Sequence, residues 1–410
     1  MTVTALDASN AVVTTYSGTV HFTSSDGQAS SGNGLPANYT FVGGDSGSHT
    51  FTSGVTLKTA GTQTVTATDV STSSINGHAT VSVSPGAEAG FVVTAPGSAT
   101  VGVSFSLTVT AKDAFGNTFN DNQTLYFSSA TDPQAVFPTN CVDSLVNGVG
   151  SANITLKTVG SQTVTAHGCS IGYSSTSGTI TVSPGVVTHY AVAAPGGATA
   201  GVAFGVIVTA EDTGNNTVPS YSGTVQITSS DGQATLPPNS TLTSGTKAFI
   251  VTLKTAGTQT VTATDTVNSA LTNTSNNVTV TGAAATHLGV SAPASATAGN
   301  SFSVTVTAQD QFGNTDPNYS GTVHFTSSDA LAVLPGNSSL PSGTGTFSVT
   351  LKTAGSQTVT VRDTVTGSIT GNATVSVSPG AEAGFVVTAP GSATVGVSFS
   401  LTVTAKDAFG

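Results

Sequence analysis

Aspartates recur at fixed places in this 410-residue sequence, and hard carboxylate oxygens are the groups that bind calcium. One set follows the same predicted strand in successive repeats: Asp7, Asp113, Asp212, Asp310 and Asp407. No D-x-D-x-D-G loop surrounds them, and aspartate commonly forms turns by accepting hydrogen bonds from its own backbone. The pattern therefore favours turn residues, and it leaves Asp113, Asp212 and Asp310 as candidate calcium ligands. No other cofactor is expected.

The seven histidines form no catalytic pattern. The sequence contains no HExxH motif, no histidine close to an aspartate and serine pair, and no glycine-rich loop that opens a helix. His21 and His324 lie between apolar residues that face inward, so both are expected to point to solvent. The sequence therefore does not predict an enzyme.

The only two cysteines are Cys141 and Cys169, which lie in the same repeat. A single pair in an otherwise cysteine-free chain indicates an intradomain disulfide and an oxidising compartment. Two unpaired buried thiols are the alternative. A zinc site would need four ligands, and only His167 is close in sequence.

The sequence contains potential N-glycosylation acceptors of the type N-x-S/T, close to the number expected by chance from its Asn, Ser and Thr content. They are Asn38, Asn122, Asn153, Asn215, Asn239, Asn273, Asn277, Asn318, Asn337 and Asn372. Outward-facing Ser and Thr side chains are equally suited to carry O-glycans. Glycosylation is expected only if the chain is secreted.

Charge and hydropathy exclude two classes of partner. Only 7% of the residues are charged, the formal net charge is −11, and the eight Lys and Arg residues are scattered singly. Nucleic-acid binding needs clustered cations, so it is not expected. No run of 18 apolar residues exists, so the segment is not expected to span a membrane. No signal-peptide pattern opens the sequence, and secretion and anchoring signals are expected outside it.

The chain is an internal repeat. Residues 79–116 are identical to residues 373–410, and the phrase VTLKTAG at 55–61 returns with small changes at 154–160, 251–257 and 349–355. These positions indicate a unit of about 98 residues. The expected domains are repeat 1 (1–85, without its first strand), repeat 2 (86–184, with the cysteine pair), repeat 3 (185–281), repeat 4 (282–379) and the opening strands of a fifth repeat (380–410).

Within each unit the hydrophobic pattern has a period of two. In residues 105–112 (FSLTVTAK) apolar side chains alternate with hydroxyls and Lys112, which is typical of a half-buried strand. Turn sequences such as 113–117 (DAFGN) separate the runs. About seven short strands in 98 residues predict an all-β fold of tandem immunoglobulin-like sandwiches.

Residues 308–314 (AQDQFGN) followed by 319–325 (YSGTVHF) resemble the A-x-D-x-x-G-N and G-x-V-x-F pattern of bacterial Ig-like repeats. Such repeats occur in invasin- and intimin-like surface proteins and in other large bacterial cell-surface proteins, so the resemblance implies this fold. Two copies depart from the pattern. Residues 212–215 (DTGN) lack the Phe and are one residue shorter, which puts the turn geometry in doubt, and residues 7–10 (DASN) lack the Gly.

The joins between repeats are short, for example residues 84–90 and 183–188. A linker of this length is not a long flexible coil, so neighbouring sandwiches are expected to lie end to end as a rod.

The two ends of the sequence share one register, because residues 1–10 (MTVTALDASN) align with residues 401–410 (LTVTAKDAFG). This favours an excerpt of a longer array. In the alternative, residues 384–396 of one chain fill the missing strand of the next chain and build a head-to-tail polymer. The ten duplicated residues would then compete for one place, which counts against the polymer.

These features together predict a structural repeat array, the stalk or shaft of an extracellular fibre or a secreted or cell-surface protein. Its expected partners are neighbouring repeats of the same or an identical chain. The alternative is an adhesin that binds a surface glycan or protein through the face of one or more repeats. Repeat 2, with Tyr126, Phe137 and Tyr173, is then the best candidate for an exposed aromatic patch.

Overall fold

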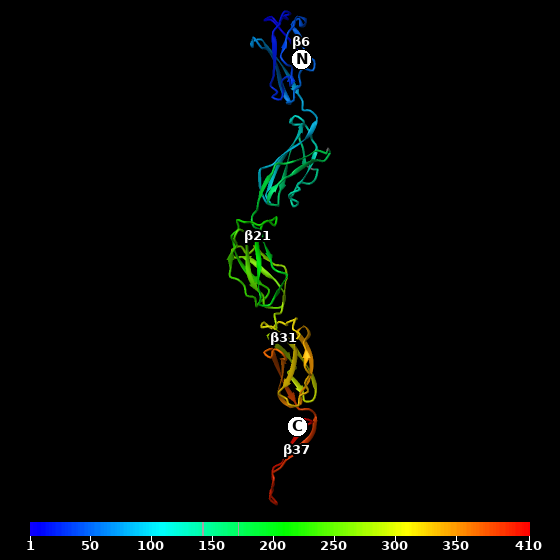
Figure 1. Ribbon diagram of the computed structural model, residues 1–410, viewed down its shortest axis with the longest axis vertical. Coiled ribbons are helices and arrows are strands. Elements are labelled where there is room, and N and C mark those ends of the chain that lie inside the picture. The colour runs from blue at the N-terminus through cyan, green and yellow to red at the C-terminus, as the bar shows by residue number, and fades with distance from the viewer. Residues whose placement is uncertain (142, 171) are drawn as a thin grey trace. The chain divides into compact units, whose positions relative to one another are not determined.

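The structure, a computed structural model, describes residues 1–141, 143–170 and 172–410. The chain divides into unit 1, made of residues 1–186 with the loop 212–216, and unit 2, made of residues 187–211 and 217–410 (Figure 1). The described residues form strands and two short 3-10 turns, with no α-helix among them. No helix in this part of the chain is long and apolar enough to cross a membrane.

The strands form because side chains alternate between core and solvent. In β11 (Ser104–Asp113) Leu107, Val109 and Ala111 are buried, while Thr108 and Thr110 lie between them and are half-buried. Successive Cβ atoms of a strand point to opposite faces, so this spacing places every apolar residue on one side of the sheet.

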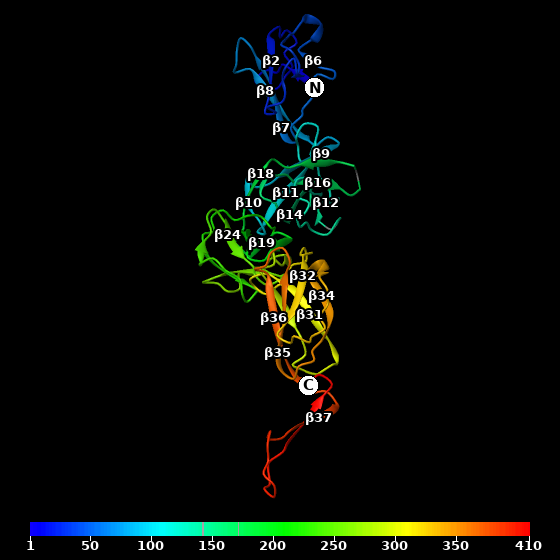
Figure 2. The ribbon, with the colours of Figure 1, turned by 60° about the horizontal axis from the view of Figure 1, so that its bottom comes forward.

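Repeat 2, in unit 1, is a complete sandwich (Figure 2). One sheet has the order β9-β11-β14, and the facing strands have the orders β13-β12-β16-β17 and β10-β18-β15. Strand β10 pairs parallel to β18, and the other pairs are antiparallel. The remaining bounds are β9 (Glu88–Thr94), β10 (Ser98–Thr100), β12 (Thr124–Ser128), β13 (Asp143–Ser144), β14 (Val149–Thr155), β15 (Gly160–Gln162), β16 (Thr165–Gly168), β17 (Ser174–Thr176) and β18 (Ile180–Ser183).

Repeat 1, also in unit 1, has the sheets β5-β2-β7-β8, β1-β6 and β3-β4. Strand β1 pairs with β6 in the way that β11 pairs with β14. The bounds are β1 (Thr2–Thr4), β2 (Thr19–Ser24), β3 (Ser30–Ser31), β4 (Gly34–Leu35), β5 (Tyr39–Thr40), the 3-10 turn η1 (Gly43–Asp45), β6 (Ser48–Thr50), β7 (Gly61–Asp69) and β8 (Asn76–Val83). No described strand lies beside β1 in the place that β9 takes beside β11.

Repeat 3, in unit 2, repeats the arrangement of repeat 2, with the sheets β19-β21-β24, β23-β22-β26-β27 and β20-β28-β25. The bounds are β19 (His189–Ala193), β20 (Gly197–Thr199), β21 (Ala203–Glu211), β22 (Thr224–Ser229), β23 (Ser240–Thr241), β24 (Thr246–Thr252), β25 (Gly257–Gln259), β26 (Val261–Asp265), β27 (Thr272–Thr274) and β28 (Val278–Thr281).

Repeat 4 and the C-terminal hairpin complete unit 2. Repeat 4 has the sheets β29-β31-β34 and β30-β36-β35-β32-β33, and the hairpin is β37-β38. The bounds are β29 (His287–Ser291), β30 (Ser295–Thr297), β31 (Ser301–Gln309), β32 (Thr322–Ser327), β33 (Ser338–Ser339), the 3-10 turn η2 (Pro341–Gly343), β34 (Thr344–Thr350), β35 (Gly355–Asp363), β36 (Thr370–Ser378), β37 (Glu382–Thr388) and β38 (Thr402–Asp407).

Each repeat has its own buried core, and the core of repeat 1 is the smallest. Among the described residues, sixteen buried residues cluster in repeat 2, whereas the cluster in repeat 1 has five, including Phe22 and Phe41. The prediction of an all-β fold of tandem sandwiches is confirmed. The domain boundaries drawn from the sequence repeat stay a prediction.

Candidate functional site

The most regular polar site in the chain is the loop that follows β11 and its counterparts. In repeat 2, Asp113 is buried and its Oδ1 accepts hydrogen bonds from the backbone N–H groups of Phe115 and Asn117, both at 2.9 Å. Its Oδ2 accepts from the N–H of Gly86, at 2.8 Å, in the preceding linker. The carboxylate therefore fixes the turn and ties the linker to it.

Asn117 carries this loop to the neighbouring repeat within unit 1. Its Nδ2 donates to the carbonyl of Lys58 at 2.7 Å, and its Oδ1 accepts from the N–H of Ala60 at 2.8 Å. Lys58 also places its Nζ 6.0 Å from the centroid of the Phe115 ring, at the outer limit of a cation–π contact. One amide side chain thus satisfies two backbone groups of the VTLKTAG loop in repeat 1.

The same joint occurs inside unit 2. Asn314 Nδ2 donates to the carbonyl of Lys254 at 2.7 Å, and Asn314 Oδ1 accepts from the N–H of Ala256 at 2.8 Å. Asp310 accepts from Asn314 Nδ2 at 2.9 Å and from the linker N–H of Ala283 at 3.0 Å. Lys254 Nζ lies 5.8 Å from the Phe312 ring centroid. We call this arrangement of aspartate, asparagine and VTLKTAG loop the repeat joint.

The third copy, residues 212–216 of unit 1, corrects a sequence expectation. The loop is not one residue shorter than the others, because Asn216 and not Asn215 takes the joint position: its Nδ2 donates to Lys157 O at 2.7 Å and to Asp212 at 2.9 Å. Asn215 adopts a φ of +60°, where two other copies have Gly116 and Gly313 and the first copy has Asn10 with a φ of +61°. Asparagine tolerates this left-handed conformation better than most residues, so the turn is kept without the Phe.

The hydrogen bonds lower the pKa of the joint aspartates. The Asn117 side-chain amide, with the Gly86, Asn117 and Phe115 N–H groups, outweighs burial and lowers the pKa of Asp113 to about 2. Burial raises the pKa of Asp310, but the donors from Asn314, Ala283 and Phe312 overcome it, and the net pKa lies below the ordinary value. The joint is therefore held by ionised carboxylates at neutral pH.

The structure does not bring the calcium candidates together. Asp113 and Asp212 lie in separate joints of unit 1, and Asp310 lies in the joint of unit 2. Among the described residues, no group of three or more His, Cys, Asp or Glu side chains converges on one point. The oxygens of these carboxylates accept N–H donors instead. Calcium binding stays an untested prediction.

Two further aspartates, Asp26 and Asp69, make hydrogen bonds that the sequence analysis did not predict. Buried Asp26 accepts hydrogen bonds from Lys58 N, Thr59 N and Thr59 Oγ1, so it shapes the other side of the joint loop. Asp69 accepts a hydrogen bond from the Tyr16 hydroxyl, and burial together with this carboxylate raises the pKa of Tyr16 to about 12. The Y-S-G phrase at residues 16–18, 221–223 and 319–321 is followed in each of these repeats by a T-x-x-D phrase, and this recurrence is the signal that could have paired the Tyr with the Asp.

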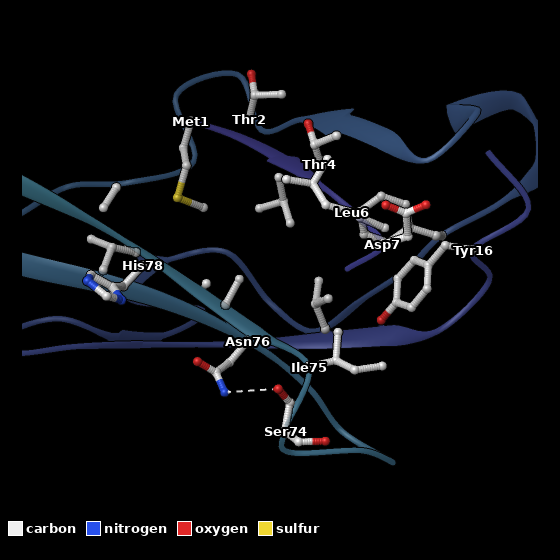
Figure 3. Close-up of a pocket in the computed structure, with 18 of the residues that line it drawn as sticks. Met1, Thr2, Thr4, Leu6, Asp7, Tyr16, Ser74, Ile75, Asn76 and His78 are labelled. Carbon is white, nitrogen blue, oxygen red and sulfur yellow. Dashed lines mark hydrogen bonds between the residues drawn. The ribbon is translucent and has the colours of Figure 1, made fainter. Parts of the chain in front are cut away.

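Repeat 1 has an open groove of about 510 Å³ between β1 and β8 (Figure 3). Met1 and Leu6 lie on one side, Ile75 and His78 lie on the other, and Tyr16 lies at one end. The floor is apolar and includes Val20, Phe41 and Val65 of the core. We call this cavity the open groove.

Cys141 and Cys169 are joined by a disulfide, with their Cα atoms 6.0 Å apart.

The side chains of all ten candidate glycosylation asparagines are exposed: Asn38, Asn122, Asn153, Asn215, Asn239, Asn273, Asn277, Asn318, Asn337 and Asn372. Exposure meets the steric requirement for a glycan, and glycosylation itself stays a prediction. His324 is exposed, as expected, whereas His21 is half-buried.

The three aromatic residues of repeat 2 do not form one exposed patch. Phe137 and Tyr173 pack against the core, and the Tyr173 hydroxyl donates to the carbonyl of Glu88 at 2.8 Å. Tyr126 stacks on His167, with ring centroids 4.4 Å apart. A shallow groove of about 420 Å³ lies beside Phe137 and Asn153. In the sequence these three aromatic residues look available for a ligand, but in the structure they contact the core or a neighbouring ring.

No protein-family model matches the sequence, and no curated protein matches it. Solved structures with a similar fold include the Escherichia coli adhesin FdeC, at 19% identity over 72% of this chain and 100% of that one, with a TM-score of 0.32. Invasin, a bacterial integrin-binding protein, is 15% identical over 95% of this chain and 76% of its own, with a TM-score of 0.27. Domains 4–9 of the surface layer protein SbsC are 18% identical over 99% of this chain and 65% of theirs, with a TM-score of 0.22. Likeness at this level leaves the function to be inferred from the contacts of the chain itself.

Proposed function

We propose that the chain is a structural repeat array, the stalk or shaft of an extracellular or cell-surface protein. The observation that carries this proposal is the repeat joint, which recurs with the same hydrogen bonds at Asn117, Asn216 and Asn314. A binding module needs one exposed site, whereas a shaft needs the same connection at every step. Bonds that tie each linker and loop to the preceding repeat restrict bending where a flexible linker would permit it.

The polar side chains on the outward faces of the strands suit a spacer that makes few nonspecific contacts. Outward strand positions carry hydroxyls that bond across the strands, for example Thr165 with Thr176 and Thr262 with Thr274, both at 2.8 Å. These pairs satisfy their own hydrogen-bonding groups without charge. The disulfide within repeat 2 favours an oxidising location outside the cytosol.

Small-angle X-ray scattering of the full chain tests this function. Replacing the joint asparagines by alanine (Asn117→Ala, Asn216→Ala and Asn314→Ala) should leave the sandwiches folded but reduce the maximum dimension, because the joints become free to bend. The matched control replaces three exposed asparagines elsewhere, Asn239, Asn318 and Asn372, by alanine. Superimposable scattering from wild type and joint variant would refute a shaft stiffened by these joints.

An adhesive role is the second candidate, favoured by the groove beside Phe137 in repeat 2. Its ligand would be a surface glycan or protein segment small enough for a groove of about 420 Å³. Glycan-array binding of the full chain tests this role, with Ser151→Arg in the groove lining as the variant that should abolish a true signal. Absence of any signal from the wild type would refute a glycan-binding role for this groove.

A further inference from the structure

One sheet of repeat 3 has an apolar outward face. In the sheet β19-β21-β24, whose strands are labelled in Figures 1 and 2, Ile207 is 51% exposed and Ile250 is 60% exposed. Four exposed neighbours on the same side of the sheet carry a methyl group or no side chain. We call the six residues the apolar face: Ala193, Ala203, Gly205, Ile207, Ala248 and Ile250.

The central positions of this face are polar in the two other complete repeats. In repeat 3, Gly205 lies opposite Ile250, and Ile207 lies opposite Ala248. The corresponding pairs are Ser106 with Asn153 and Thr108 with Ser151 in repeat 2, and Ser303 with Ser348 and Thr305 with Thr346 in repeat 4. Since the strand pairing is the same in all three repeats, the fold itself does not demand apolar side chains here.

The contacts that the structure describes within repeat 3 do not require a glycine at position 205. The φ of Gly205 lies outside the left-handed region, and a Cβ atom added to it would meet no atom within 4 Å. Ser106 and Ser303 occupy the same position in the same strand pairing. Glycine weakens the interior of a strand and often marks a place where another molecule or segment approaches closely. The space above Gly205 therefore suits a contact from outside the repeat.

The four central residues alternate in size along and across the strands. Ile207 and Ile250 are diagonal neighbours on adjacent strands, and Gly205 and Ala248 occupy the other diagonal. Two such faces can meet about a two-fold axis that runs across the strands. Ile207 then lies over Gly205 of the second copy, and Ile250 lies over Ala248 of the second copy. Large residues that face small ones interdigitate when two β-sheets pack together, so this face is complementary to itself.

We propose that the apolar face of repeat 3 binds the apolar face of a second copy of this chain, with the facing strands antiparallel. The proposal adds a lateral contact to the structural role inferred above, and it does not depend on the repeat joints. A two-fold contact uses the same patch on both partners, so one self-complementary face is sufficient. Six small residues are fewer than the roughly 20 to 30 per partner of a standard interface, so we expect weak association.

Charge favours the antiparallel arrangement. Glu211 lies on the outward side at the end of β21, and its Oε2 is 3.3 Å from Nε2 of His189. About an axis across the strands, the Glu211 side chains of the two copies lie at opposite ends of the contact. About an axis along the strands, the two carboxylates would lie at the same end and would repel each other.

The chemistry of the apolar face fits a second copy better than a sugar. Binding sites for small molecules are usually concave and combine apolar walls with a few placed polar groups. The apolar face consists of Ala, Gly and Ile, so its six residues have neither aromatic rings nor side-chain hydrogen-bonding groups. A sheet face of this kind is best covered by another sheet.

Sedimentation equilibrium of the full chain tests the proposal at concentrations up to about 1 mM, where even weak specific contacts are populated. We expect a dimer that forms as the concentration rises. Added salt should strengthen it, because each chain carries a formal net charge of −11 and salt screens the repulsion between the copies. The variant Gly205→Ser/Ile207→Thr/Ala248→Thr/Ile250→Ser should stay monomeric. It carries the residues of repeat 4 at the same positions, so it should keep the wild-type melting curve.

The matched control is Val92→Ser/Val149→Ser, which removes two valines from the outward face of the corresponding sheet in repeat 2. They are 48% and 43% exposed, so they test whether exposed apolar side chains on any repeat cause association. The control should dimerise like the wild type. A wild-type chain that stays monomeric up to about 1 mM overturns the proposal, and so does equal loss of dimer in the control.

Disulfide trapping tests the orientation without changing the four central residues. A chain with Ala203→Cys mixed with a chain with Thr209→Cys should give more cross-linked dimer than the same Ala203→Cys chain mixed with Thr252→Cys. The reverse order would overturn the antiparallel contact. Monomers whose scattering still depends on the joint asparagines would refute the lateral contact and leave the shaft intact. Dimers whose scattering is indifferent to those asparagines would refute the stiff shaft alone, so the two failures are distinguishable.

Discussion

The Asn314→Ala variant removes the side chain that connects repeats 3 and 4 inside unit 2. Asn314 makes two hydrogen bonds to the VTLKTAG loop, one to Lys254 O at 2.7 Å and one from Ala256 N at 2.8 Å. Each net hydrogen bond contributes about 1 kcal/mol, so the variant should weaken the joint by about 2 kcal/mol. Because about 1.4 kcal/mol corresponds to a factor of ten, the joint should open about 30-fold more often.

Amide hydrogen exchange reports this opening directly, because the Ala256 N–H is itself a donor to Asn314 Oδ1. Exchange at Ala256 should accelerate about 30-fold in Asn314→Ala. The N–H of Val261, which donates to Ser275 Oγ inside repeat 3, should keep its wild-type rate. The comparison separates opening of the joint from unfolding of the repeat.

The control is Asn372→Ala, which removes an exposed amide from β36 of repeat 4 and should leave both exchange rates unchanged. If the Ala256 amide of the wild type already exchanges as fast as in Asn314→Ala, the asparagine does not hold the joint. If Val261 accelerates together with Ala256, the variant has destabilised the whole repeat, and the reasoning is wrong.

Acidification should lower the melting temperature between about pH 4 and pH 2, because hydrogen bonds depress the pKa of Asp113 to about 2. A carboxylate whose pKa is lowered by folding contributes its full stability above its unfolded pKa and loses that stability as the pH falls through its folded pKa. A melting temperature that stays constant from pH 5 to pH 2 would contradict this. Replacing Cys141 and Cys169 by serine should destabilise repeat 2 by about 3 kcal/mol and leave repeat 4 unchanged, which proteolysis of the two repeats can compare; equal sensitivity would be the contrary result. Val361→Ala should destabilise repeat 4 by about 1–3 kcal/mol in denaturant titration, because this side chain is fully buried, whereas the exposed Val365→Ala should change it by less than about 0.5 kcal/mol. Calcium should not change the melting temperature, because the joint carboxylates already accept hydrogen bonds from N–H donors. A melting temperature that falls when a chelator is added would contradict this and would support Asp113, Asp212 and Asp310 as calcium ligands.

The inward faces of the strands could be predicted from sequence because they depend on a local rule. Side chains alternate along a strand, so the spacing of Leu107, Val109 and Ala111 was enough to place them in the core. The position of the turns followed in the same way from DAFGN and its relatives. The repeat length came from phrases that recur along the chain, without reference to any contact.

The joint could be predicted only in part. The recurrence of Asp and Asn in the loop was visible, but their partners are backbone groups of another repeat about 60 residues away, such as Lys58 O and Lys254 O. Every residue has a backbone carbonyl, so the amino-acid sequence does not show which carbonyl accepts the hydrogen bond. In the third copy the sequence motif was read as ending at Asn215, whereas in the fold Asn216 makes the bond to the preceding loop.

The sequence by itself determined that the chain is a series of similar β-sandwiches, because period-two alternation and an approximately 98-residue repeat are properties of residue order. Only the tertiary structure decided which apolar residues are buried. Phe91 and Phe385 occupy identical sequence surroundings, yet one lies in a core and the other is largely exposed. Burial depends on what covers a strand from outside its own segment, and that cover is set by packing between segments distant in the chain.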